Sequence, residues 1–448
     1  MTVVALCSGG LERLVSNEIR KLAEHSKIDF RITGTGFGKL RFETELTGIY
    51  YALFSLRAAD RLLLEAGFFP AADFDELFEG TRAIAWENYI PKGMGLAVDK
   101  VRSNHSRLSA ETAIQAIVHK AAAERLCKCY AQARLPEDGA AAKLRVYIEK
   151  DQAQILLDLC GKPLFKRGYR VEGGTAPLRE STAAALLLQS LWRRKYPLYD
   201  PFCGSGTIVT EAALYAWDVA PGLARHFEIS KLAFADEKIE KQIRQSLAEK
   251  IDISRIVQIY GSDSDSSVVE TAKTNLKHTL NMIDAASAGA KRPFSPPKLW
   301  WRKMEEAKAP ADEGFIITNP PYGIRLLDKE SAEALYREMA VLKNNFPFWK
   351  INVLSTHAGF ESFFGSNANR CKKITSGAYE TYFYEYDSAK PVSASSQNTR
   401  TRNPADGARK PVYKHDSGKP DPANSQNKHD RNPTDSARKP AKTVTYTW

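Results

Sequence analysis

A glycine turn between an apolar strand and a helix constrains the fold of this chain more than any other feature. The apolar run 196–199 precedes the turn at 200–207, and residues 207–214 have the composition of a helix. Strand, glycine turn and helix in this order open a nucleotide-binding α/β unit. Gly204 and Gly206 carry no Cβ, so the backbone there can pass close to a ligand. We therefore expect a cofactor at this turn.

The segment 181–387 is expected to form a domain around that turn. Residues 161–180 form a connector rich in cations, and an apolar helix at 181–194 follows it. Strands are expected at 256–260, 315–318, 351–355 and 379–384. This alternation of strands with helical stretches predicts an α/β fold with a mostly parallel, doubly wound sheet.

Two α+β units are expected before this domain, at 1–59 and 60–160. In the second unit, Arg102, His105 and Arg107 form a basic edge between an expected strand and an expected helix. Such an edge can hold phosphate groups of a nucleic acid. A solvated charged surface explains it equally well, so both interpretations stay open.

Composition excludes several classes of protein. No apolar run reaches about 18 residues, so no membrane span is expected, and the N-terminus lacks the pattern of a secretory signal. Six cysteines are scattered over 448 residues, which favours a reducing, cytoplasmic location over a disulfide framework. Cys127 and Cys129 point to different sides of an expected helix, and no metal site is expected.

The positive charge is concentrated at the C-terminal end. The chain carries a net charge of +11, and residues 388–448 hold twelve Lys/Arg against five Asp/Glu. A positive balance indicates a polyanionic partner. The tail has few large apolar residues, and its run 402–411 recurs in altered form at 431–440, so we expect a disordered basic tail. It either raises RNA affinity through diffuse electrostatics or is dispensable.

The details of the turn favour S-adenosylmethionine (SAM) over other nucleotide ligands. A P-loop requires Lys after its last glycine, but Thr207 follows Gly206, and a dinucleotide fold requires G-x-G-x-x-G. A strand-end carboxylate such as Asp200 can accept hydrogen bonds from the amino group of SAM. Asp263, or Asp265 in its place, is expected to bind the ribose hydroxyls. The predicted cofactor residues are Asp200, Pro201, Phe202, Cys203, Gly204, Ser205, Gly206, Thr207, Asp263 and Asp265.

The run Asn319, Pro320, Pro321 and Tyr322 is the predicted catalytic motif. The exocyclic amine of a base is a poor nucleophile, because its lone pair is delocalised into the ring. The Asn319 side-chain oxygen and the Pro320 carbonyl can accept its hydrogens and aim its nitrogen at a methyl group, while Pro321 stiffens the loop. Tyr322 can stack on the base, which contributes about 1–3 kcal/mol. Alone this motif is as well explained by a rigid turn; the upstream cofactor turn favours catalysis.

With these motifs in place, the chain over 1–387 resembles the THUMP-domain RNA guanine-N2 methyltransferases of the bacterial 23S rRNA type. The stretches that carry the resemblance are 106–108, 115–120, 164–170, 176–180, 198–207, 220–227 and 318–323. The resemblance implies a ferredoxin-like unit at 1–59, a THUMP RNA-binding domain at 60–160 and a Rossmann-like class I methyltransferase domain at 181–387. Lys303 stands before Met304 where the family often has an aspartate that touches adenine.

The function that this resemblance implies is methyl transfer from SAM to the exocyclic N2 amine of a guanosine in 23S rRNA. Methylation of a tRNA guanine is the alternative within the class. A DNA adenine methyltransferase shares the catalytic motif, but the THUMP-like region argues against it. A non-catalytic RNA-binding ribosome assembly factor is the alternative from another class, and the intact Asp200 and Asn319 argue against that.

Overall fold

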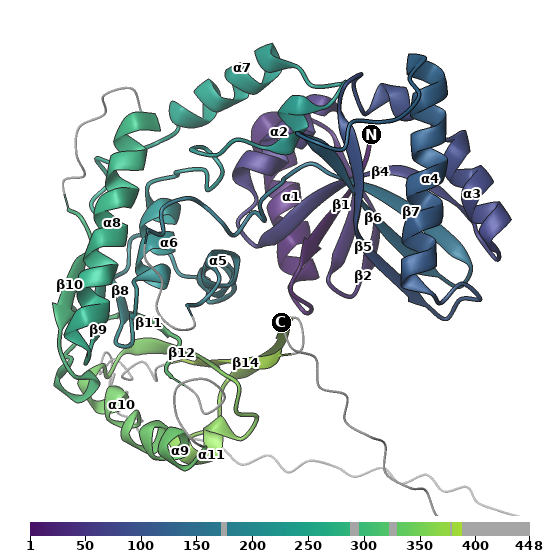
Figure 1. The fold of residues 1–448 in the computed structure, drawn as a ribbon. Coiled ribbons are helices and arrows are strands. Elements are labelled where there is room, and N and C mark those ends of the chain that lie inside the picture. The colour runs from purple at the N-terminus through teal and green to yellow at the C-terminus, as the bar shows by residue number, and fades with distance from the viewer. Residues whose placement is uncertain (172–176, 287–294, 322–328, 377–378, 388–448) are drawn as a thin grey trace, which may run out of the picture. The chain divides into compact units, whose positions relative to one another are not determined.

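The computed structural model describes residues 1–171, 177–286, 295–321, 329–376 and 379–387. The basic tail at 388–448, for which we expected disorder, lies outside them. The described residues form two seven-stranded sheets with helices packed against them (Figure 1). None of the described helices combines the length and apolarity needed to cross a membrane.

The first sheet is built from the N-terminal part of the chain. Its strands are β1 (Thr2–Cys7), β2 (Phe30–Gly36), β3 (Lys39–Thr44), β4 (Ala59–Pro70), β5 (Gly95–Asn104), β6 (Ala141–Glu149) and β7 (Gln152–Asp158). They lie in the order β2-β3-β1-β4-β7-β6-β5, and β5 with β6 is the parallel pair. Strand β4 pairs with β1 on one side and with β7 on the other. The two α+β units expected at 1–59 and 60–160 therefore share one sheet.

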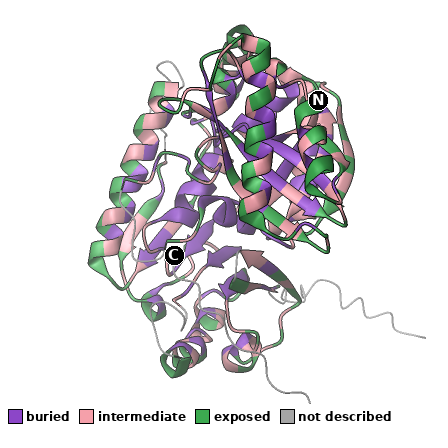
Figure 2. Ribbon diagram, turned by 45° about the vertical axis from the view of Figure 1, so that its right-hand side comes forward, coloured by how far each residue is buried: buried purple, intermediate pink, exposed green. Residues whose placement is uncertain are grey.

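Helices cover the apolar face of this sheet. They are α1 (Glu12–Ser26), α2 (Leu46–Ser55), α3 (Phe74–Ala83) and α4 (Glu111–Tyr130). Leu11, Val15 and Ile19, which share one face at helical spacing, are buried. Figure 2 shows that the strands beneath these helices are largely buried. Asp73 caps α3 by accepting a hydrogen bond from the Glu76 N–H.

The second sheet carries the glycine turn. Its strands are β8 (Leu198–Asp200), β9 (Ile259–Asp263), β10 (Lys298–Trp301), β11 (Gly314–Thr318), β12 (Trp349–Ser355), β13 (Arg370–Ser376) and β14 (Tyr379–Tyr386). They lie in the order β10-β9-β8-β11-β12-β14-β13. The first five run parallel, and β14 and β13 add an antiparallel edge. The mostly parallel sheet is confirmed, and β10 and β13 are additions to the predicted strands.

Helices lie on both faces of the second sheet, which confirms the doubly wound arrangement. These helices are α5 (Glu180–Gln189), α6 (Thr207–Ala216), α8 (Ser266–Ala286), α9 (Lys329–Glu338), α10 (Val341–Asn345) and α11 (Phe360–Phe364). Helix α7 (Glu237–Ala248) packs instead against α2 of the N-terminal part. Short 3₁₀ helices elsewhere in the chain span Trp86–Asn88, Glu228–Lys231 and Met304–Glu306. Leu198 packs in the apolar cluster that includes Ala212 of α6. Its neighbour Tyr199 points to the opposite face, into the cluster that includes Tyr336 of α9.

Candidate cofactor and catalytic site

Three predicted site residues meet at the carboxyl edge of the second sheet. Asp200 ends β8, Asp263 ends β9, and Asn319 directly follows β11. Strand β8 lies between β9 and β11. The chain continues from β8 to β9 and β10 on one side and then returns to β11 on the other, so the strand order reverses here. Ligands of open α/β sheets bind outside the carboxyl ends of the strands at such a reversal.

The glycine turn has the backbone that its sequence requires. Gly204 has φ +49° and Gly206 has φ +81°, a left-handed region that favours glycine. A Cβ at Gly206 would lie 3.0 Å from the Cβ of Ala272, whereas a Cβ at Gly204 would meet no protein atom within 4 Å. Gly206 therefore serves close packing against α8, and Gly204 faces open space in which a ligand has room.

Asp200 is buried beneath this turn. Its Oδ1 accepts a hydrogen bond of 2.7 Å from the Thr318 hydroxyl and one of 3.2 Å from the Phe202 N–H. Burial raises the pKa of Asp200 to about 7; these two hydrogen bonds oppose that rise, and the nearby Asp263 carboxylate adds to it. The contact with Thr318 ties the end of β8 to the end of β11, directly before Asn319.

Asp263 and Asp265 have different surroundings. Asp263 accepts hydrogen bonds from the Gly204 N–H at 3.0 Å and the Asp265 N–H at 3.1 Å, and burial raises its pKa. Asp265 is exposed and accepts both the N–H and the hydroxyl of Ser267 at the start of α8. Hydrogen bonds from Ser267 lower the pKa of Asp265. Asp263 therefore contacts the cofactor turn directly, whereas Asp265 caps a helix.

Asn319 presents an unusual polar atom. Its Oδ1 is buried, and no described residue donates a hydrogen bond to it. Buried acceptors nearly always have a partner, so this oxygen stands out among the described residues as an acceptor that can still take a hydrogen bond. Pro320 is buried and Pro321 half-buried beside it. Tyr322, the fourth residue of the predicted motif, lies outside the described residues.

The other residues of the turn mainly support it. Cys203 is buried, which raises the pKa of its thiol, so the thiol stays protonated. The Cys203 N–H donates to the Ser262 carbonyl at 2.9 Å, and its carbonyl accepts the Gly206 N–H at 2.8 Å. Phe202 packs against the apolar cluster around Tyr199. Pro201 is buried with them.

Two further side chains, which sequence reasoning missed, hold the second half of the turn. Asn275 of α8 donates from Nδ2 to the Ser205 carbonyl at 3.1 Å. Arg170 of the connector donates from Nη2 to the Thr207 hydroxyl at 3.0 Å. An asparagine in a helix and an arginine in a basic run are ordinary in sequence, so no pattern marked them. Thr318 was a detectable signal, because it is the one polar residue in the apolar run before Asn319.

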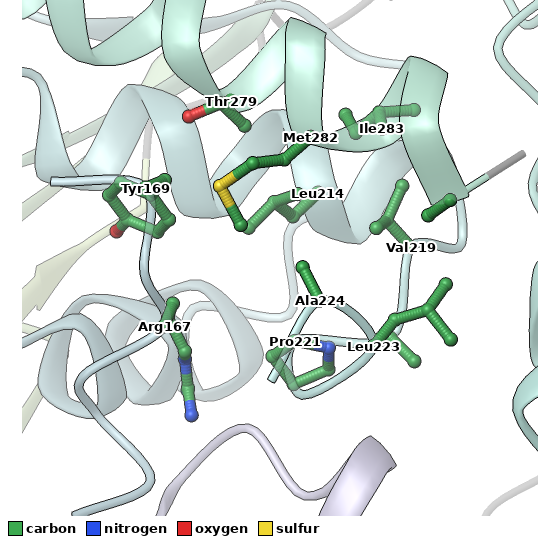
Figure 3. A pocket seen from close by; sticks show the side chains of 12 residues that line it. Arg167, Tyr169, Leu214, Val219, Pro221, Leu223, Ala224, Thr279, Met282 and Ile283 are labelled. Carbon is green, nitrogen blue, oxygen red and sulfur yellow. The ribbon is translucent and has the colours of Figure 1, made fainter. Parts of the chain in front are cut away.

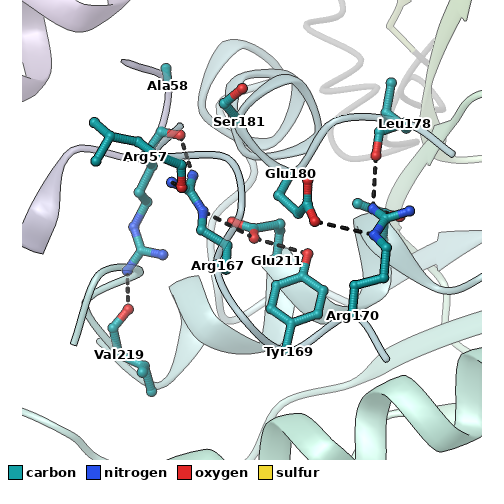
Figure 4. A network of polar contacts seen from close by, with 12 residues as sticks. Arg57, Ala58, Arg167, Tyr169, Arg170, Leu178, Glu180, Ser181, Glu211 and Val219 are labelled. Carbon is teal, nitrogen blue, oxygen red and sulfur yellow. Dashed lines mark hydrogen bonds and ion pairs between the residues drawn. The ribbon is translucent and has the colours of Figure 1, made fainter. Parts of the chain in front are cut away.

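Arg167 of the connector belongs to a buried polar network. Arg167 and Glu211 of α6 are both almost fully buried, with 3.6 Å between Arg167 Nε and Glu211 Oε1 (Figure 4). Tyr169 donates its hydroxyl to the same Glu211 oxygen at 3.0 Å. Arg167 also donates to the Arg57 carbonyl before β4. These contacts stabilise the junction of the two sheets.

The basic edge of the second N-terminal unit is exposed and ion-paired. Arg102 lies 2.9 Å from a carboxylate oxygen of Glu111, and Arg107 lies 3.5 Å from one of Asp151. Exposed pairs of this kind contribute little to stability. Both interpretations of the edge, phosphate binding and a solvated surface, remain compatible with this arrangement.

An apolar pocket lies away from the carboxyl edge. Figure 3 shows Met282 and Ile283 of α8 facing Leu214 of α6 and Leu223 of the segment after it. None of its lining residues belongs to the glycine turn or to the catalytic motif. The pocket therefore does not coincide with the predicted cofactor site. Within the described residues, no group of three or more His, Cys, Asp or Glu could hold a metal ion.

Family models match three consecutive parts of the chain. The descriptions are an RlmL ferredoxin-like domain at residues 2–63, a THUMP domain at 71–158 and an RMKL-like methyltransferase domain at 167–384. The last of these contains the glycine turn, Asp263 and Asn319.

Known relatives match nearly the same length. A Bacillus subtilis (strain 168) protein named "Putative RNA methyltransferase YpsC" is 34% identical over 86% of this chain and 95% of its own. The crystal structure of SMU.472 in complex with SAH is 33% identical, covers 87% of this chain and 98% of its own, and has a TM-score of 0.77. A Listeria monocytogenes (str. 4b F2365) structure described as a "predicted N6-adenine-specific DNA methylase" is 34% identical, covers 87% and 96%, and has a TM-score of 0.76.

Proposed function

The chain belongs to the THUMP-domain family of RMKL-like methyltransferases, and from this premise we propose that it methylates the exocyclic N2 of a guanosine in 23S rRNA. The methyl donor is SAM, since a relative was crystallised with S-adenosylhomocysteine (SAH), the demethylated form of SAM. The THUMP domain match supports RNA as the substrate class, as does the name of the Bacillus relative. The resemblance of the motifs to the 23S rRNA guanine-N2 methyltransferases supports a large-subunit rRNA target, and the match at 2–63 extends the likeness to the N-terminal ferredoxin-like unit.

The residues at the carboxyl edge fit this donor. The open space at Gly204 leaves room for a ligand against the backbone. Asp200 and Asp263 would hold the amino group and the ribose hydroxyls, as their places at the ends of adjacent strands allow. SAM supplies a methyl group activated by its positively charged sulfur.

The observation that carries the proposed chemistry is the buried Oδ1 of Asn319, to which no described residue donates a hydrogen bond. A buried acceptor at the end of β11 can accept a hydrogen bond from the exocyclic amine of a guanine. This contact fixes the direction of the nitrogen lone pair, and such alignment lowers the barrier of a bimolecular step. The proton becomes acidic once the nitrogen is methylated, so the site needs no strong general base.

Asp200 and Thr318 give Asn319 its position. The Thr318 hydroxyl is held by Asp200 at 2.7 Å, so the backbone directly before Asn319 is anchored to β8. Thr318 is fully buried and pairs with Val353 of β12 on its other side. The catalytic oxygen therefore follows a rigid strand, which is where placed dipoles are most effective.

A methyl-transfer assay tests the proposal directly. Purified protein and labelled SAM are incubated with total RNA from a strain that lacks this gene, and the labelled nucleosides are identified. We expect the label in large-subunit rRNA as N2-methylguanosine.

The other outcomes separate the alternatives. Label in tRNA would keep the chemistry and change the substrate. In a parallel assay with DNA in place of RNA, label as N6-methyladenine would move the chain to the activity described for the Listeria relative. SAH binding without label in any nucleic acid would favour the non-catalytic assembly factor.

A further inference from the structure

The end of the connector is linked to the glycine turn by one direct hydrogen bond and by one that passes through Asn275 of α8. Residues 167–171 lie between β7, the last strand of the first sheet along the chain, and α5, and they pass the start of α6. At the end of this run, Arg170 donates a hydrogen bond to Thr207 of the turn. The Val171 N–H donates to Asn275, which itself bonds the turn. The connector is therefore in physical contact with the predicted donor site.

Asn275 makes the first of these contacts. It is 1% exposed and lies on α8, which packs directly against the turn at Ala272 and Gly206. Its Nδ2 donates to the Ser205 carbonyl at 3.1 Å, and its Oδ1 accepts the Val171 N–H at 2.9 Å. One buried amide thus joins the connector to the turn.

Arg170 makes the second contact. Its Nη2 donates to the Thr207 hydroxyl at 3.0 Å and to the Leu178 carbonyl at 2.9 Å. Its Nε donates to Glu180 Oε1 at 3.1 Å, in a pair that is mostly buried (Figure 4). The planar guanidinium therefore fixes the first residue of α6 relative to the first residue of α5.

The contacts from Asn275 and Arg170 support the part of the turn that β9 does not hold. The first half, through Gly204, is fixed by Asp263 and by the Ser262 carbonyl at the end of β9. Ser205 and Thr207 lie beyond that support, on either side of Gly206. For these two residues, Asn275 and Arg170 provide the side-chain contacts described above.

We propose that Asn275 and Arg170 are positioning residues for the methyl donor, and that the connector is thereby a structural part of the donor site. They act through Ser205 and Thr207, without touching the donor themselves. This inference rests on the proposed function, because it assumes that the turn binds SAM. Loss of either contact loosens the turn and weakens donor binding, while the chemistry at Asn319 is left intact.

SAH affinity measured by isothermal titration calorimetry on the full chain tests this inference. Asn275→Ala should weaken SAH binding about tenfold, the effect of losing one hydrogen bond of ordinary strength. Thr279→Ala is the matched control, because Thr279 is also 1% exposed on α8 and its hydroxyl bonds only the helix backbone at the Asn275 carbonyl in the described contacts. Thr279→Ala should lower thermal stability similarly and leave SAH affinity within about twofold.

Steady-state kinetics on the RNA substrate add a readout that a purely structural role would not change. The KM for SAM of Asn275→Ala should rise about tenfold with kcat nearly constant, because the variant loses donor binding and keeps the transition-state contacts. Arg170→Lys provides a second variant if Asn275→Ala folds poorly, since lysine keeps the charge and loses the two-sided contact.

The outcomes distinguish this inference from the proposed function. Wild-type protein that binds no SAH would overturn the donor site itself. Wild-type binding with unchanged affinity in folded Asn275→Ala and Arg170→Lys would overturn only the positioning role. Equal loss of affinity in Thr279→Ala would also overturn it, because the effect would then come from any defect in α8.

Discussion

Asp200 and Asn319 lie at neighbouring strand ends and differ in their hydrogen-bond partners. Asp200 already accepts hydrogen bonds from Thr318 and Phe202, so it organises the site as well as facing it. Asn319 Oδ1 has no such partner among the described residues. A buried acceptor left open costs folding free energy, and the proposed function accounts for that cost, because there Asn319 accepts a hydrogen bond from the substrate amine.

Replacement of Asn319 separates catalysis from binding. Asn319→Ala should lower kcat about 10²- to 10³-fold, the loss typical for one oriented polar group, and SAH affinity should stay near the wild-type value. Asn319→Asp keeps a side-chain acceptor in the same place and should retain more activity than the alanine variant. Single-turnover rates and SAH titration measure both quantities. Near wild-type turnover in Asn319→Ala would rule out the acceptor role.

The raised pKa of Asp200 predicts a pH dependence of stability. An ordinary aspartate in the unfolded chain has a pKa of about 3.9, and in the folded chain Asp200 has one of about 7. Between these values the folded state binds more protons, so the contribution of Asp200 to stability falls as pH rises from about 4 to about 7 and stays low above that.

Asp200→Asn therefore should gain thermal stability relative to wild type across this pH range. Asparagine keeps an acceptor for the Thr318 hydroxyl and has no charge to desolvate. Melting temperatures of both proteins without ligand, at pH 5 and pH 8, test this expectation. A difference between the variants that is equal at the two pH values would contradict it.

At the scale of the element, the two glycines of the turn should respond differently to a methyl group. Gly206→Ala places a Cβ 3.0 Å from Ala272 at φ +81°, so it should destabilise the fold by about 1–3 kcal/mol. Gly204→Ala has no neighbour within 4 Å and should be milder for the fold, but its methyl group enters the space expected for the donor. Denaturant titration and SAH binding together distinguish the two effects, and identical behaviour of the variants would contradict this division of roles.

The elements that could be predicted from sequence are those with a local signal. The glycine turn and the motif at Asn319 follow apolar runs, and those runs became β8 and β11. Strand β10 escaped prediction because it is a four-residue edge strand with aromatic residues, Trp300 and Trp301, on both faces. Asn275 and Arg170 escaped because their role arises only when α8 and the connector meet the turn, and that meeting is tertiary.

At the scale of the whole molecule, a buried network joins the first sheet to the methyltransferase region. Arg167 touches both the Arg57 carbonyl and Glu211. Burial raises the pKa of Glu211, and the Arg167 guanidinium opposes that rise. Arg57 also donates to the Val219 carbonyl at 2.7 Å. A pair as deeply buried as Arg167 and Glu211 is tolerated because each charge offsets the other.

Replacing either Arg167 or Glu211 alone should lower the free energy of unfolding strongly. Replacing both should lower it by less than the two single changes together. Arg167→Met removes the main cation beside the buried Glu211 and should lower the free energy of unfolding by about 3–5 kcal/mol. The double variant Arg167→Met/Glu211→Gln should be more stable than the sum of the single changes predicts, by a coupling energy of about 0.5–3 kcal/mol. Urea titration of the four proteins measures this coupling, and strict additivity would contradict a direct interaction.

The position of strand β4 limits where the chain can be cut into fragments that fold separately. Because β4 pairs with β1 on one side and β7 on the other, the ferredoxin-like and THUMP regions are neighbours within one hydrogen-bonded ladder. A fragment that begins after β4 would leave β7 with an unprotected edge, and such edges invite pairing with other chains. We therefore expect the two regions to fold as one unit, although separate sequence families describe them.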